Sequence, residues 1–298
     1  MNKLSQEILA NYQRRKSFKE KTAFINLLQE HLPIHIESSG HIIKNRNIII
    51  GNIEKAKIIL TAHYDTCAWL PFPNLCFPTN LWMMLLYNFF IILLFIAFIT
   101  ILRLGLWAFN IDEFLIDIIA DMAVLIIIYA TIFGYPNKHN ANDNTSGIIT
   151  LIEMIDHFKD HEDIAFVFFD NEEKGLIGSS RLNKQHFTKA KLIINYDCVG
   201  DGDHILVIPS KAALTYLPLL KQHYTDQYNK KFKVIAAGFR LYPSDQMNFK
   251  NSLAIAAFNR NKLLGYYLDK IHTNKDTSFD PKNIEVIIAS TINFINSL

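Results

Sequence analysis

The sequence has few cysteines, little net charge and no block of basic residues. Its 298 residues include only 3 cysteines, at the scattered positions Cys67, Cys76 and Cys198, and the formal net charge is +2. Three scattered cysteines do not make a disulfide framework, and they favour a reducing compartment. A nearly balanced charge without a basic run gives no electrostatic basis for binding nucleic acid.

Charged residues are missing altogether from one long stretch. Residues 81–102 contain no Lys, Arg, Asp or Glu, and residues 114–135 are again strongly apolar, interrupted only by two aspartates. A helix over the first stretch would rise about 33 Å, and the hydrocarbon core of a bilayer is about 30 Å thick. We therefore expect residues 81–135 to be a two-helix transmembrane hairpin that binds the lipid bilayer. A hydrophobic cap or a dimerisation hairpin on a soluble protein is the alternative.

The rest of the chain alternates apolar runs with amphipathic stretches. This alternation predicts an α/β fold, with a mostly parallel mixed sheet flanked by helices. The domain would be discontinuous, formed by residues 1–80 and 136–298 around the inserted hairpin. Isoleucines at 42–43 and 48–50 suggest a β-hairpin. The other expected strands are 58–62, 164–169, 192–196, 205–208, 234–236 and 253–258, and the expected helices lie within 4–31 and at 145–159, 175–187, 211–229 and 282–297.

Acidic residues and a histidine follow three of these predicted strands at the point where each strand ends. His63 and Asp65 follow the first, Glu172 and Glu173 the second, and Asp197 the third. In an open α/β sheet the ligand site forms at the carboxyl ends of the strands, so these side chains should converge. Two adjacent glutamates repel each other and resist burial, and a bound metal ion would compensate their charges.

Two further residues in loops complete a set of ligands. Asp143 lies just before a predicted helix, and His272 lies in a late loop. Two histidines and three carboxylates can supply two zinc sites if one carboxylate bridges both ions, which leaves one glutamate to carry a proton. Asp65 could accept a hydrogen bond from the second ring nitrogen of His63 and so fix the orientation of the ring.

Five short motifs occur in a fixed order along the chain. They are His63-Tyr64-Asp65, Asn142-Asp143-Asn144-Thr145-Ser146-Gly147, Glu172-Glu173-Lys174-Gly175-Leu176-Ile177-Gly178-Ser179, Tyr196-Asp197 and His272-Thr273. This set resembles the motifs of the dizinc aminopeptidases, a group that includes bacterial leucyl aminopeptidase and aminopeptidase Y. Glutamate carboxypeptidase and glutaminyl cyclase are relatives of that group. The resemblance covers about residues 40–75 and 136–280.

The resemblance implies two Zn²⁺ ions per chain with Asp143 as the bridging ligand. His63 and Asp197 would complete one metal site. Glu173 and His272 would complete the other. Glu172 would be the general base that takes a proton from water and returns it to the leaving amine of a peptide substrate.

The resemblance also extends to Ser244-Asp245, although Gln246 follows where the family often has histidine. We expect Asp245 to be a structural or supporting residue. Tyr242 is a candidate donor to the developing oxyanion, and an ordinary loop tyrosine is the favoured alternative. Cys67 lies close to His63 in sequence, but a free cysteine is favoured over a metal ligand because the ligand set is already complete.

These features predict a membrane-anchored dizinc exopeptidase, most simply an aminopeptidase. A carboxypeptidase or dipeptidase of the same chemistry is an alternative, and it would need a basic residue such as Arg240 to bind a substrate carboxylate. An inactive membrane scaffold with the same fold is another alternative. Glutaminyl cyclase is disfavoured because both histidines and the bridging aspartate of a two-metal site are present.

The position of the hairpin constrains the membrane topology. His63 precedes the hairpin and Asp143 follows it, so the chain must leave and return on one side of the membrane. Residues before the hairpin carry far more Lys and Arg than the turn at 103–113, and no signal peptide is apparent. The positive-inside tendency therefore favours a two-pass protein with a cytoplasmic catalytic domain.

Overall fold

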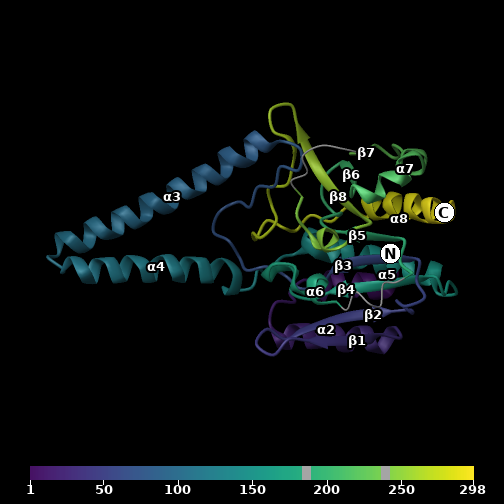
Figure 1. The fold of residues 1–298 in the computed structure, drawn as a ribbon, viewed down its shortest axis with the longest axis horizontal. Coiled ribbons are helices and arrows are strands. Elements are labelled where there is room, and N and C mark those ends of the chain that lie inside the picture. The colour runs from purple at the N-terminus through teal and green to yellow at the C-terminus, as the bar shows by residue number, and fades with distance from the viewer. Residues whose placement is uncertain (183–188, 236–241) are drawn as a thin grey trace.

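Buried strands rich in isoleucine, valine and phenylalanine form the centre of the molecule. The computed structural model describes residues 1–182, 189–235 and 242–298. Within these residues the strands make a nine-stranded sheet in the order β1-β2-β4-β3-β5-β8-β6-β7, with β9 paired to β8 (Figure 1). The strands are β1 (His35–Ser39), β2 (Asn45–Ile50), β3 (Ile58–His63), β4 (Ile164–Phe169), β5 (Leu192–Tyr196), β6 (His204–Pro209), β7 (Lys231–Val234), β8 (Ser252–Asn261) and β9 (Gly265–Tyr267).

The four central strands, β4, β3, β5 and β8, are parallel, while β2 and β6 run antiparallel to their neighbours β4 and β8. In the register of β3 and β4, His63 lies opposite Phe169, so the two strands end side by side. The loops that follow them therefore start at the same edge of the sheet. The predicted α/β fold with a mixed sheet flanked by helices is confirmed.

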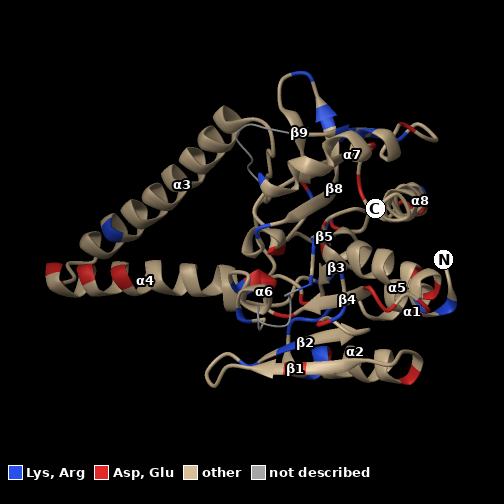
Figure 2. Cartoon of the chain, turned by 45° about the vertical axis from the view of Figure 1, so that its right-hand side comes forward, with Lys and Arg blue, Asp and Glu red and all other residues tan. Residues whose placement is uncertain are grey.

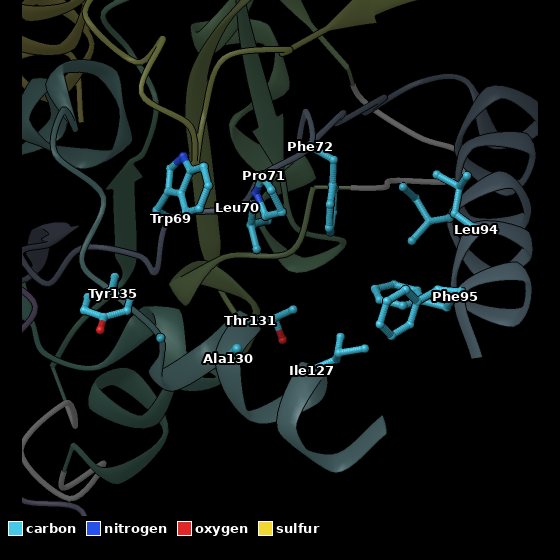
Figure 3. Close-up of a pocket in the computed structure, with 13 residues that line it drawn as sticks. Trp69, Leu70, Pro71, Phe72, Leu94, Phe95, Ile127, Ala130, Thr131 and Tyr135 are labelled. Carbon is cyan, nitrogen blue, oxygen red and sulfur yellow. The ribbon is translucent and has the colours of Figure 1, made fainter. Parts of the chain in front are cut away.

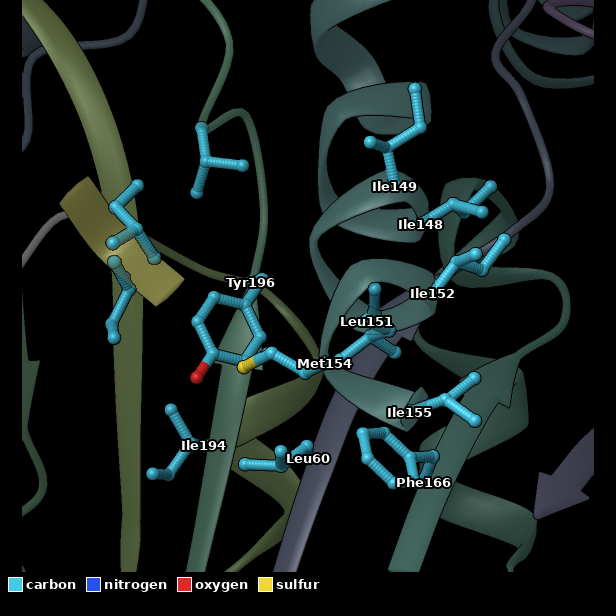
Figure 4. Packing of buried hydrophobic residues seen from close by; sticks show 14 of the residues in the cluster. Leu60, Ile148, Ile149, Leu151, Ile152, Met154, Ile155, Phe166, Ile194 and Tyr196 are labelled. Carbon is cyan, nitrogen blue, oxygen red and sulfur yellow. The ribbon is translucent and has the colours of Figure 1, made fainter. Parts of the chain in front are cut away.

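Helices cover both faces of the sheet. They are α1 (Lys3–Asn11), α2 (Phe18–His31), α5 (Gly147–Phe158), α6 (Ile177–Arg181), α7 (Leu217–His223) and α8 (Pro281–Ile295). Figure 4 shows α5 packing Leu151 and Ile155 toward Leu60 and Ile194 of the sheet. Because successive strand side chains alternate between faces, Ile59 belongs to a separate buried cluster on the other side. Each fully buried side chain of this size contributes about 1.5–3 kcal/mol.

Two long helices, α3 (Leu81–Ala108) and α4 (Glu113–Phe133), project from this domain as a hairpin (Figure 1). Both are long and apolar enough to cross a membrane by length and composition. In the described structure α3 has no buried residue, which distinguishes it from the core helix of a soluble protein. Figure 2 shows that charged residues on the hairpin gather toward its far end, where Arg103 Nη2 lies 2.5 Å from Asp117 Oδ1.

Several predicted boundaries were wrong. The first hairpin strand is β1 rather than residues 42–43, and Ile42 is 99% exposed in the connecting turn. The composition of residues 42–43 predicts a strand, but residues 35–39 are the ones that pair with β2. The predicted helix at 211–229 ends at His223, and the short strand β9 was not predicted. Of the helix predicted at 175–187, residues 183–188 lie outside the described part of the chain.

Candidate metal centre and catalytic cleft

Three strands deliver ionisable side chains to one edge of the sheet. His63 is the last residue of β3, Glu172 and Glu173 form a short 3-10 turn after β4, and Asp197 follows β5. Asn171 has a φ of 55°, and this left-handed residue turns the chain sharply between β4 and the two glutamates. The predicted convergence at the carboxyl ends of the strands is what the structure shows.

The carboxylate of Asp143 lies between the two histidines. Its Oδ1 is 3.3 Å from Nε2 of His63, and its Oδ2 is 3.1 Å from Nε2 of His272. Asp197 Oδ1 lies 3.6 Å from the same nitrogen of His63, and Glu173 Oε2 lies 3.3 Å from that of His272. The five side chains thus divide into two groups of three that share Asp143.

Two carboxylate oxygens in these groups have no hydrogen-bond donor in the described part of the chain, and this indicates a binding site for a cation. Glu173 Oε1 and Asp197 Oδ1 are buried and accept no hydrogen bond from any residue that the structure describes. Ligand atoms of His63, Asp143 and Glu173 all lie within 4.8 Å of one another. Buried oxygens without a donor are costly, and a bound cation would remove that cost. Imidazole nitrogens with carboxylate oxygens are a donor set that suits zinc.

Burial and crowding of charge perturb the ionisable groups of this centre. Burial raises the pKa of Glu172 and of Glu173 well above 4.5, and the Asp143 charge raises that of Glu173 further. Burial alone would lower the pKa of His63, but the neighbouring carboxylates outweigh it and raise that pKa well above 6.5. Without a metal ion, the cluster therefore holds protons that the positive charge of zinc would displace.

Asp65 holds the two glutamates in place through their main chain. Its Oδ1 accepts a hydrogen bond from the N–H of Glu172 at 2.9 Å, and its Oδ2 accepts one from the N–H of Glu173 at 3.3 Å. The sequence predicted that this carboxylate would bind the ring of His63. In the structure Oδ1 of Asp65 lies 3.7 Å from Nδ1 of His63, within ion-pair distance, and the main-chain oxygen of Asp65 lies 3.1 Å from the same nitrogen.

Asp276 has a comparable supporting position that the sequence analysis missed. Its carboxylate accepts hydrogen bonds from the N–H groups of Asn142 and Asp143, at 2.9 and 3.0 Å. Burial raises the pKa of Asp276 to about 8. The only available signal was an acidic residue in the same loop as His272, and a single acid in a polar loop predicts nothing on its own.

A buried ion pair supports the turn that carries the glutamates. The ammonium group of Lys21, on α2, contacts the Asp170 carboxylate and also donates to Asn171 Oδ1 at 2.9 Å. Both partners of the ion pair are almost fully buried. Breaking such a pair by removing one partner typically costs about 3–5 kcal/mol, so Lys21 fixes the start of this turn.

Comparison with known proteins places the chain in a family. The profile described as peptidase family M28 matches residues 129–294, a span that includes four of the five motifs. The chain belongs to peptidase family M28. Family membership confirms the resemblance drawn from the motifs. No curated protein sequence matches it.

The fold of this M28 peptidase is similar to those of several solved structures. A glutaminyl cyclase from Porphyromonas gingivalis has a TM-score of 0.61 at 17% identity, covering 99% of this chain and 96% of its own. A Zn-dependent exopeptidase from Parabacteroides distasonis has a TM-score of 0.59 at 14% identity, covering 98% and 96%. The LapA aminopeptidase from Legionella pneumophila has a TM-score of 0.55 at 13% identity, covering 98% and 69%. These likenesses establish a shared fold.

The remaining candidates from the sequence lie around the M28 centre. Tyr242 lines the cleft, and its buried hydroxyl donates to the main-chain oxygen of Asp197 at 3.1 Å. Asp245 is fully buried, and neither of its carboxylate oxygens has a hydrogen-bonding partner among the described residues. Burial raises the pKa of Asp245 to about 7. The Cys67 thiol lies within 4.8 Å of ligand atoms of Glu173 and His272, and it donates to Asn140 Oδ1 at 3.3 Å.

The centre opens into a cleft of about 330 Å³ that the hairpin helps to form. Its walls include the candidate ligands, Tyr242 and three residues from the first turns of α3, namely Met84, Tyr87 and Asn88. The sequence placed the ends of the hairpin beside the zinc site, and α3 in fact lines the site itself.

Proposed function

We propose that this M28 peptidase is a membrane-anchored dizinc aminopeptidase. The observation that carries the proposal is the position of Asp143, with one carboxylate oxygen facing each histidine. His63, Asp143 and Asp197 would hold one Zn²⁺, and His272, Asp143 and Glu173 would hold the second. When bound, the two ions would lower the pKa of a water molecule and polarise the carbonyl of the substrate.

Glu172 is the carboxylate of the cleft that this scheme leaves free of the metal. It lies beside Glu173 but in neither of the two groups around Asp143, and its side chain lines the cleft. In the proposed reaction its carboxylate accepts a proton from water and donates it to the nitrogen of the leaving amine. The hydrogen bond from its N–H to Asp65 keeps its main chain fixed during both transfers.

Two alternative functions agree less well with the residues of this cleft. A carboxypeptidase or dipeptidase needs a cation for the substrate carboxylate, and the candidate Arg240 lies outside the described residues. An inactive scaffold would have no reason to keep five converging ligands and a separate acid. The proposal of an aminopeptidase leaves the amino terminus of the substrate in the acidic cleft, where carboxylates favour a cation.

The exposed hairpin supports the proposed membrane anchor. On the domain side, the ammonium of Lys16 donates to the carbonyl oxygen of Ile132 at 2.6 Å, in the last turn of α4. On the far side, Asp112 caps the start of α4 and Glu113 is the first residue of that helix. Residues before the hairpin carry many Lys and Arg, against Arg103 alone at residues 103–113, so the positive-inside tendency favours a cytoplasmic catalytic domain.

Digestion of a peptide library by the purified full-length protein in detergent, followed by mass spectrometry, tests the proposed activity. We expect stepwise loss of amino-terminal residues, inhibition by a chelator and recovery with Zn²⁺. Stepwise loss of carboxyl-terminal residues from the peptides would refute the aminopeptidase proposal and support a carboxypeptidase. Absence of cleavage with two zinc ions bound would overturn the peptidase proposal.

The topology is tested separately by fractionation and labelling. We expect the protein to stay with membranes after a carbonate wash. An Asn110→Cys variant, in the turn between α3 and α4, should react with a membrane-impermeant maleimide added outside intact cells. Labelling of this cysteine only after lysis would reverse the proposed orientation.

A further inference from the structure

One face of α3 runs from the metal cleft into the apolar part of the hairpin. Its first part, Met84, Tyr87 and Asn88, lines the cleft that contains the candidate ligands. Its second part lines a separate cavity, and consists of Ile91, Leu94, Phe95 and Phe98. These positions follow the spacing of three and four residues that places side chains on one face of a helix. The cleft and the cavity therefore share one continuous stripe of α3.

The second cavity lies in the wedge between the two helices of the hairpin. It has a volume of about 490 Å³, and Figure 3 shows side chains from residues 69–72, α3 and α4 around a common space. Nearly all of the lining is apolar, and its aromatic side chains are those of Trp69, Phe72, Phe95, Phe98 and Tyr135. The volume is within the range of about 300–1,000 Å³ that small-ligand sites in proteins occupy.

The segment between β3 and α3 joins the cavity to the metal centre. Residues 69–72 line the cavity and residues 74–77 line the cleft. The N–H of Leu70 donates to the carbonyl oxygen of the candidate ligand His272 at 2.9 Å. The hydroxyl of Tyr87 donates to the carbonyl oxygen of Pro73, which ties this segment to α3. The walls of the cavity are thus fixed relative to the metal ligands.

We propose that this stripe of α3 is a substrate track, which binds an apolar peptide segment while the amino terminus lies in the metal cleft. The proposal rests on the aminopeptidase function proposed above and names its substrate class. From Met84 to Phe98 the helix rises about 21 Å, the length of about six extended residues. The substrates are peptides whose amino-terminal residue reaches the cleft and whose following residues are apolar and reside in the bilayer.

The position of the cavity favours a peptide over a bilayer lipid as its occupant. The apolar track leads into a cleft that contains the proposed metal ligands His63 and Asp143 and the proposed base Glu172. The reaction proposed for this cleft is the hydrolysis of an amide, and a lipid chain contains no amide. The polar side chain of Asn88 lies at the transition between the two parts, where it can hydrogen-bond a peptide backbone.

Paired substrates test the track in vesicles of phosphatidylcholine that contain the full-length protein. One peptide carries six apolar residues after its first two residues, and a second carries six polar residues in the same places. A dipeptide with the same first two residues reports on the metal centre alone. We expect kcat/KM to be at least about tenfold higher for the apolar peptide than for the polar one, a preference equivalent to about two buried methylene groups.

A matched pair of variants locates the preference in the cavity. Ala130→Trp fills the cavity from α4, whereas Ala97→Trp places the same side chain on the exposed surface of α3, outside the cavity. We expect Ala130→Trp to lower the ratio of apolar-peptide to dipeptide kcat/KM about tenfold, the loss of about two methylene contacts. Ala97→Trp should leave both rates unchanged. An unchanged ratio in Ala130→Trp would overturn the track.

Photochemical crosslinking distinguishes the occupants independently of turnover. In the Glu172→Gln variant, an apolar peptide with a photoreactive residue at its fifth position should label residues 91–98, and unlabelled apolar peptide should compete. Labelling of these residues by a photoreactive phosphatidylcholine that the peptide does not displace would assign the cavity to lipid and refute the proposal. If the dipeptide is not cleaved while the apolar peptide still crosslinks, the proposed activity fails but the binding site stands.

Discussion

The carboxylate of Asp65 accepts a hydrogen bond from the main-chain N–H of Glu172 at 2.9 Å. Its second oxygen accepts the N–H of the next residue at 3.3 Å, so one aspartate fixes the backbone of both glutamates. The proposed base and a proposed zinc ligand are therefore positioned by the same side chain. An acid that contacts neither the metal nor the substrate can then control the rate of the reaction.

Replacement of Asp65 by asparagine should lower kcat with little loss of metal. The amide offers one acceptor oxygen to two N–H donors, and leaving one buried donor unsatisfied costs about 1–3 kcal/mol, or about 5- to 150-fold in rate if it is lost in the transition state. Steady-state kinetics with parallel metal analysis measures both quantities. A variant that loses zinc and activity together would instead indicate a role in metal binding.

Replacement of Glu172 by glutamine should abolish most turnover while both metal ions stay bound. The amide keeps the shape of the side chain but cannot accept a proton, and loss of a general base typically lowers the rate about 10²- to 10⁴-fold. Glu30→Gln, on the exposed face of α2, is a matched control. Near-normal activity of the Glu172→Gln variant would refute the assignment of Glu172 as the general base.

Replacement of Asp143 by alanine should remove zinc from both sites. Asp143 is the one ligand common to the two groups, so its loss leaves two protein ligands for each ion where about three are needed. Metal analysis after purification should fall from about two zinc ions per chain to fewer than about one. His272→Ala is the comparison, since it should weaken one site and spare the other.

Removal of zinc should destabilise the protein more strongly as the pH rises. Burial raises the folded-state pKa of Glu172 and Glu173 well above 4.5, so the metal-free fold is favoured below that pH and loses this advantage as the pH increases through the folded pKa values. Zinc would bind the ionised carboxylate of Glu173, and its positive charge would favour the ionised form of the neighbouring Glu172. Binding stabilises the fold by about 2.7 kcal/mol at a hundred times the Kd.

Thermal unfolding with zinc and with a chelator measures this difference. The gap between the two Tm values should widen from about pH 5 to about pH 8. A gap that stays constant over this range would contradict coupling between these glutamates and the metal.

The sequence predicted the fold and the convergence of the ligands because both depend on local patterns. Apolar runs such as residues 164–169 form strands, and the acids that follow them must lie at a sheet edge. The supporting contacts were not predictable in this way. Lys21 meets Asp170, and Asp276 meets Asn142, only after distant helices and loops pack together.

The same reasoning explains the error at Ile42. Two adjacent isoleucines have the composition of a strand, but pairing with β2 is decided by register, and residues 35–39 pair with residues 45–49. The role of Asp65 shows a similar limit. Its proximity to His63 in sequence predicted a contact with the ring, at 3.7 Å in the structure, but not the N–H groups of a later turn that the tertiary structure also brings to its carboxylate.

The hairpin is inserted between His63 and Asp143, and this order has a consequence for biosynthesis. On the proposed topology, the ribosome completes the first zinc ligand before the membrane spans and the bridging ligand after them. The metal centre cannot close until both spans and the ligands that follow them have been synthesised. A nascent chain therefore cannot hydrolyse a peptide before the segment that would anchor it to the membrane has been made.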